Sequence, residues 1–75
     1  MDDFIAKLSS MTEYQLREEA KRILTYYRNK SKTNTFDQNI EMNKKSAPVF
    51  SSLISEFDKR NMSSQYEEIR RYVNR

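Results

Sequence analysis

The sequence predicts an all-α fold, a small bundle of four to five short helices, and three observations support this. Residues 12–30 place apolar side chains on one helical edge and charged side chains on the opposite edge. Residues 49–57 carry a second apolar stripe at helical spacing. The chain has no glycine and one proline, so tight β-hairpins lack their preferred turn residues. Because 75 residues suffice for one domain only, we expect a single helical domain over residues 1–75.

A short first helix is predicted from Asp2 or Asp3 to Ser9, because acidic side chains favour the positive end of the helix dipole. Its apolar edge is formed by Phe4, Ile5 and Leu8. A helix of this length is not stable alone in water, so we expect it to dock on another element.

The central helix is predicted over residues 12–30. Thr12 is a favoured N-cap residue, and Gln15, three positions later, completes a capping box. Glu18 and Arg22 are four residues apart, in the favourable order for an ion pair on one helix face. Capping, charge and periodicity therefore agree for this segment.

Residues 31–45 allow two interpretations. The first is a loop followed by a short helix from Phe36 to Lys44, which Thr35 or Asn34 would cap. In this helix Phe36 and Ile40 share one edge. The second is a mobile basic loop in which the same two apolar side chains act as anchors. The spacing favours the short helix.

A further helix is predicted to begin at residues 46–48, because proline suits the first turn, where its missing N–H would be unpaired anyway. The residue before a proline avoids helical backbone, so we expect no continuous helix from Phe36 onward. In a chain without glycine, asparagine suits helix ends, and Asn29 and Asn61 are placed for this role. The apolar stripe of the helix that begins at residues 46–48 is formed by Val49, Phe50, Leu53, Ile54 and Phe57.

Ser64 and Glu67 form a capping-box pattern that predicts the last helix, with Ser63 as a competing cap. Its apolar side is formed by Tyr66, Ile69 and Val73, with Tyr72 beside them. The predicted core of the whole domain comprises Leu16, Ala20, Ile23, Leu24, Val49, Phe50, Leu53, Ile54, Phe57 and Ile69. We expect the central helix to pack on the apolar stripe of residues 49–57.

The composition argues against an enzyme. The chain has no cysteine and no histidine, so thiolate sites, the commonest zinc ligands and the usual general base are missing. Phosphate-binding glycine loops are excluded because the chain has no glycine. We expect no catalytic residues, no metal and no cofactor. No apolar run has the length of a membrane span, and no signal peptide is visible, so we expect a cytoplasmic protein without a membrane partner.

Positive charge is concentrated in the middle of the chain. Residues 20–45 hold seven basic and two acidic residues, whereas residues 1–19 hold two basic and five acidic ones. An anionic partner is therefore expected to contact the middle segment. The same charges are also consistent with a helix face that is simply solvated. The five tyrosines are likewise consistent with a structural position at the edge of a thin core.

Two candidate binding surfaces follow from the tyrosines and the basic residues. Adjacent Tyr26 and Tyr27 point about 100° apart on a helix, so at least one of them is available to a partner. The first surface comprises Tyr26, Tyr27, Arg28, Lys30, Lys32, Arg22, Lys44 and Lys45. The second comprises Tyr66, Arg70, Arg71 and Tyr72.

These features favour a small intracellular interaction protein, such as an adaptor, inhibitor or regulatory subunit, that presents a helix face rich in tyrosine and arginine to a partner protein. The alternative is a nucleic-acid-binding regulator that uses the basic residues of segment 20–45. A thin core also favours a homo-oligomer, in which each chain would bury more apolar surface. Small size and high charge are typical of accessory proteins encoded by phages and mobile elements.

Overall fold

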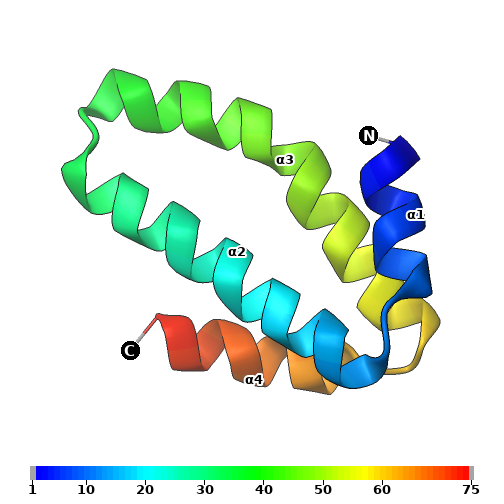
Figure 1. The fold of residues 1–75 in the computed structure, drawn as a ribbon. Helices are drawn as coiled ribbons and strands as arrows, with labels where there is room; N and C mark the ends of the chain where they lie inside the picture. The colour runs from blue at the N-terminus through cyan, green and yellow to red at the C-terminus, as the bar shows by residue number, and fades with distance from the viewer. Residues whose placement is uncertain (1, 75) are drawn as a thin grey trace.

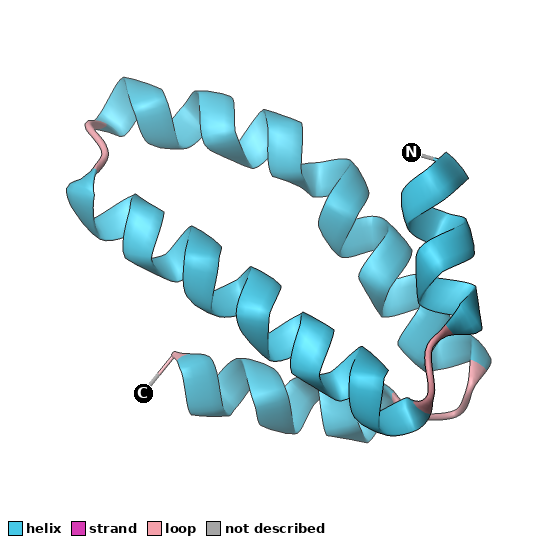
Figure 2. Ribbon diagram, in the orientation of Figure 1, coloured by secondary structure: helices cyan, strands magenta, loops and turns pink. Residues whose placement is uncertain are grey.

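The structure, a computed structural model, describes residues 2–74, and its regular structure is helical throughout. It contains α1 (Asp2–Ser10), α2 (Glu13–Thr33), α3 (Phe36–Lys59) and α4 (Ser63–Val73). The connections between them are short (Figure 2). The predicted all-α class is confirmed. Within the described part of the chain, none of the helices has the length and apolar character needed to cross a membrane.

The helices form an open, flat arrangement. Helices α2 and α3 are antiparallel and meet at a turn far from both termini, while α4 lies along the first half of α2 and α1 lies beside the end of α3 (Figure 1). The molecule measures 35 × 29 × 15 Å. Its radius of gyration is 12.7 Å, whereas a compact domain of this length has about 11 Å. The bundle arrangement is therefore not confirmed.

Two helices begin with the same capping arrangement. The Thr12 hydroxyl accepts the Gln15 N–H at 3.2 Å, and the Gln15 side chain accepts the Thr12 N–H at 3.0 Å. The Thr35 hydroxyl likewise accepts the Gln38 N–H at 3.3 Å, with the return bond at 2.9 Å. The capping box predicted at Thr12 is confirmed. Of the two N-cap candidates proposed for the helix that begins at Phe36, Thr35 rather than Asn34 is the cap.

The predicted break before Pro48 is wrong, because α3 continues through this residue. The proline removes one backbone donor, so the carbonyl of Lys44 has no N–H partner four residues later. Both residues are exposed, and water can satisfy that carbonyl. The helix bends midway along its length (Figure 1), as expected near a proline.

Residues 31–45 are divided between two helices. Residues 31–33 complete α2, which therefore passes Asn29, the residue expected to end it. Residues 34 and 35 form the turn, and the remainder begins α3. Helix, rather than a basic loop, is thus the structure of nearly all of this segment.

The end of α3 is a Schellman motif built on Asn61, as predicted for a chain without glycine. Asn61 has a positive φ of 59°. The Met62 N–H donates to the Phe57 carbonyl at 2.8 Å, and the Asn61 N–H donates to the Asp58 carbonyl at 3.0 Å. This pair of bonds satisfies two carbonyls that the helix end would leave free.

The capping box predicted for α4 is wrong. The N-cap is Met62, which makes no side-chain capping bond, and Ser63 is already helical. Met62 is buried and held by the Schellman bond, so the helix starts before Ser64 could act as its cap. The Ser63 hydroxyl instead donates to an Asp58 carboxylate oxygen at 3.0 Å.

The core lies where α1, α3 and α4 meet the first half of α2. Its buried members are Leu8, Leu16, Ala20, Ile23, Leu53, Phe57, Met62, Tyr66, Ile69 and Val73. Three predicted core residues, Leu24, Val49 and Phe50, are only partly buried, and Ile54 is exposed, contrary to prediction. The main neighbour of α2 is α4 rather than the 49–57 stripe of α3. Each large apolar side chain buried here contributes about 1.5–3 kcal/mol.

Arg60 ties α1 to the end of α3. Its guanidinium donates to the carbonyls of Leu8 at 2.9 Å, Ser9 at 3.2 Å and Met11 at 2.8 Å. It also pairs with the Glu56 carboxylate at 2.9 Å. These bonds satisfy carbonyls at the negative end of α1, where a cation is favoured.

Candidate partner-binding groove

A groove of about 350 Å³ lies between α2 and α3, on the part of this helix pair that extends beyond the core. We call it the α2–α3 groove. Helix α2 contributes Tyr26, Tyr27 and Lys30, and its C-cap residue Asn34, in the turn, lines the groove beside them. Helix α3 contributes Gln38, Glu41, Met42 and Lys45. Four of the eight residues of the first predicted surface thus line one concavity: Tyr26, Tyr27, Lys30 and Lys45.

The two adjacent tyrosines have different roles in the groove. The Tyr27 ring packs on Phe50 at a centroid distance of 5.2 Å and borders the core. Tyr26 is 53% exposed, and its ring meets Tyr27 edge to face at 5.1 Å. This agrees with the predicted divergence of their side chains. Tyr27 therefore fixes the wall of the groove, and Tyr26 offers an accessible aromatic surface.

The charges around the groove are mostly positive. The Lys30 ammonium lies 6.0 Å from the centroid of the Tyr26 ring, a cation–π distance. The Lys45 ammonium is 3.8 Å from the Glu41 carboxylate, and both side chains are well exposed. An exposed pair of this kind contributes little to stability, so both groups stay available to a ligand.

Four side chains that line the groove were missed by sequence reasoning: Asn34, Gln38, Glu41 and Met42. The Asn34 amide donates to the Met42 sulfur at 3.6 Å. These residues come together only because the chain reverses at residues 34 and 35. Gln38 and Met42 are spaced to share a helix face with Lys45, which was predicted, so this spacing could have found both of them once α3 was known to be helical.

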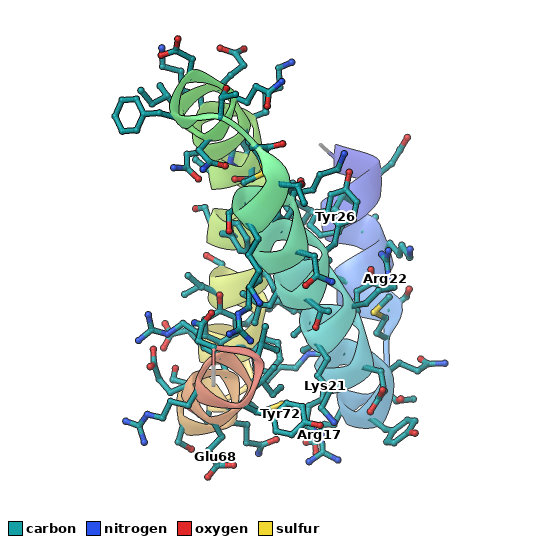
Figure 3. All side chains as sticks on the ribbon, turned by 90° about the vertical axis from the view of Figure 1, so that its left-hand side faces the viewer. Arg17, Lys21, Arg22, Tyr26, Glu68 and Tyr72 are labelled. Carbon is teal, nitrogen blue, oxygen red and sulfur yellow. The ribbon has the colours of Figure 1, made fainter. Side chains whose placement is uncertain are left out.

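A second hollow of about 250 Å³ adjoins the groove on the side of α1. It shares Tyr26 and Tyr27 with the groove and adds Phe4, Arg22 and Val49. Figure 3 shows Arg22 and Tyr26 on the side of α2 that faces α1. The concave surface therefore continues from the α2–α3 turn toward α1.

Arg22 does not form the ion pair predicted for it. Its guanidinium pairs with Glu19 rather than with Glu18. The Glu18 carboxylate instead faces Lys21 at 3.6 Å. In both pairs the partners are three residues apart rather than four, a spacing that also brings side chains together on a helix.

The other predicted residues of the first surface do not line the groove. Arg28 donates to the carbonyl of Val73 at the end of α4. A cation is favoured there because the C-terminal end of a helix is the negative end of its dipole. This contact makes Arg28 part of the α2–α4 packing. Lys32 and Lys44 are exposed, but neither lines the groove.

The second predicted surface is not assembled on one face. Tyr66 is buried, with its ring 5.3 Å from that of Phe57. Burial raises the pKa of the Tyr66 phenol above its ordinary value, Arg70 opposes this rise, and Glu67 adds to it. Arg71 and Tyr72 are exposed on other sides of the helix.

A third hollow of about 350 Å³ lies between α2 and α4. Figure 3 shows Arg17 and Lys21 of α2 beside Glu68 and Tyr72 of α4. The Lys21 ammonium lies 5.8 Å from the Tyr72 ring centroid. The exposed Tyr72 ring thus has a lysine neighbour, as Tyr26 has in the groove, and charged side chains of both signs line this hollow.

No protein-family model, curated protein or solved structure matches this chain. Within residues 2–74, no three carboxylate, imidazole or thiol side chains gather in a group that could hold a metal ion. The α2–α3 groove is the candidate site on its geometry alone.

Proposed function

We propose that this chain is a small, non-enzymatic intracellular interaction protein, an adaptor, inhibitor or regulatory subunit, that binds a partner protein through the α2–α3 groove. The observation that carries the proposal is the setting of Tyr26. Its ring lines two adjoining hollows and is still half exposed, while Tyr27 beneath it is fixed on Phe50.

The side chains around Tyr26 suit protein recognition. Tyrosine supplies a large amphipathic surface and loses little conformational entropy when it is fixed by a partner. Met42, in the opposite wall, is flexible and can adapt to the shape of an apolar ligand. Lys30, Lys45 and Arg22 flank these apolar groups, so an acidic rim on the partner would match this surface.

Substitution of Tyr26 tests this proposal. The full chain would be expressed in its native host and cross-linked, and the captured proteins quantified by mass spectrometry. For Tyr26→Ala we expect recovery of the specific partner to fall by about tenfold or more, since a buried aromatic anchor is worth about 2 kcal/mol or more. Circular dichroism would verify that the variant keeps its helical content.

Tyr14→Ala is the matched control, because Tyr14 is also exposed on α2 but lies outside the α2–α3 groove. The control is expected to retain the partner at the wild-type level. Equal recovery by wild type and Tyr26→Ala would contradict binding through this groove. Equal loss in both variants would point to a different surface.

Nucleic-acid binding is the second candidate function. It is favoured by Lys30, Lys32, Lys44 and Lys45, which are all exposed on the two helices that form the groove. The carboxylate of Glu41 in the same groove weighs against it. Fluorescence anisotropy with duplex and single-stranded oligonucleotides, repeated over a range of salt concentrations, separates the two functions. Phosphate binding requires affinity that falls steeply with salt, and its absence would eliminate this candidate.

A further inference from the structure

The outer face of α3, on the side of the helix away from the groove, carries an apolar stripe of its own. At about 100° per residue, its four side chains fall within about 40° of one another. Phe36 is 78% exposed, Ile54 47% and Ile40 41%, and Ala47 between them is also exposed. We call Phe36, Ile40, Ala47 and Ile54 the α3 stripe.

The spacing of the α3 stripe is that of a helix–helix interface. Successive members are four, seven and seven residues apart, which matches the heptad repeat of paired helices. Ala47 lies near the middle, and its small side chain allows a second backbone to approach closely. The stripe occupies most of the length of a 24-residue helix.

The surface area of the chain also indicates an uncovered face. The protein exposes 5421 Å², whereas a monomeric protein of 9.1 kDa exposes about 4,900 Å². The surplus is about 500 Å² per chain. If each of two copies buried an area of this size, the interface would total about 1,000 Å², the size at which specific interfaces begin. The thickness of only 15 Å explains why the fold leaves so much surface open.

We propose that two copies of this chain associate through their α3 stripes, with the helices antiparallel and the two-fold axis passing near Ala47. Ile40 of each copy then faces Ile54 of the other, because both residues are seven positions from Ala47. Asn43 and Ser51, each four positions from Ala47, also face one another. Both are uncharged, so no like charges meet close to the axis. A symmetric pair of this kind uses the same patch on both subunits.

The proposed dimer leaves the partner-binding surface open. The groove residues of α3 lie about half a turn away from the stripe around the helix, since Gln38 and Lys45 are offset from Phe36 by about 180–200°. Dimerisation and partner binding can therefore be tested separately.

Sedimentation equilibrium of the full chain over a range of concentrations tests the dimer. We expect the average mass to rise with concentration from 9.1 kDa toward twice that value. Ala47→Glu places two carboxylates at the axis and is expected to weaken association by roughly tenfold or more, because like charges in an interface are strongly unfavourable. Ala47 is exposed, so the substitution leaves the core of the monomer intact.

Gln38→Glu is the matched control, because it makes the same charge change on the groove face of the same helix. Glutamate also preserves the capping box at Thr35. This variant is expected to dimerise as the wild type does. A constant mass of 9.1 kDa for the wild type at all concentrations would overturn the proposal, and a different protein would then be the candidate occupant of the stripe. Undiminished association of Ala47→Glu would also overturn it, as would equal weakening by Gln38→Glu.

Discussion

At the scale of single residues, Arg60 shows how a charged side chain can stabilise a small core. Its guanidinium serves both the exposed end of α1 and the carboxylate of Glu56, which is only 7% exposed. Because α1 is too short to be stable alone, this contact helps to fix it against α3. The planar arginine fork can satisfy several acceptors at once, which a lysine cannot do.

Arg60→Ala is expected to lower the free energy of unfolding by about 2–4 kcal/mol, because it removes several charged hydrogen bonds and leaves Glu56 buried without its partner. Urea denaturation followed by circular dichroism measures this change. Arg70→Ala is the control, because Arg70 pairs with Glu67 on the exposed side of α4, and its loss should cost about 0.5 kcal/mol or less. If the two variants were equally stable, Arg60 would not be a structural link.

At the scale of helices, the end of α3 depends on a backbone conformation that most residues avoid. Asn61 occupies the left-handed region at φ 59°, where β-branched residues are strongly disfavoured. Asn61→Val is therefore expected to reduce the free energy of unfolding by about 1–2 kcal/mol, whereas Asn61→Gly should be neutral or slightly stabilising. Thermal and urea unfolding of both variants measure this difference.

Asn74 provides the control for Asn61. It caps the end of α4 with an ordinary negative φ of −91°, and it is exposed. Asn74→Val should therefore leave stability within about 0.5 kcal/mol of the wild type. A larger loss at Asn74 than at Asn61 would show that the positive φ is not the source of the effect.

Local signals predicted some helix boundaries and misplaced others. The capping residues Thr12 and Thr35 and the helix end at Asn61 could be predicted, because each depends on bonds within a few residues. Pro48 could not be placed from its neighbours alone, since its cost of about 3 kcal/mol inside a helix competes with the packing of the whole of α3. The start at Met62 was missed because the preceding helix end determines it.

The candidate groove was predictable in part for a similar reason. Tyr26, Tyr27 and Lys30 lie on one helix, so their shared location followed from the local sequence. Met42 joins them only through the antiparallel pairing of α2 and α3. The internal contact of Arg28 with Val73 bridges 45 residues of sequence, and no local pattern indicates it.

At the scale of the whole molecule, the core is confined to one end. Residues 24–45 are all exposed or only partly buried, whereas the buried core side chains come from α1, α4 and the facing parts of α2 and α3, together with Met62. The end of the α2–α3 pair that includes the groove is therefore held mainly by hydrogen bonds within each helix, a few ring contacts and two side-chain hydrogen bonds, from Asn34 to Met42 and from Asn39 to the Ser31 carbonyl. Such a region opens locally at a lower free energy than the global unfolding of a protein.

Hydrogen exchange of the full chain should consequently be graded along α3. At concentrations low enough to keep the chain monomeric, amides of residues 39–45 are expected to exchange at least about tenfold faster than those of residues 53–57, because opening near the turn disrupts little buried surface. Exchange followed by mass spectrometry or NMR measures this ratio. Raising the concentration should slow exchange in residues 39–45 if two α3 stripes pair. Uniform protection along α3 at low concentration would instead show that the helix opens as one unit, with its stability shared across the Pro48 bend.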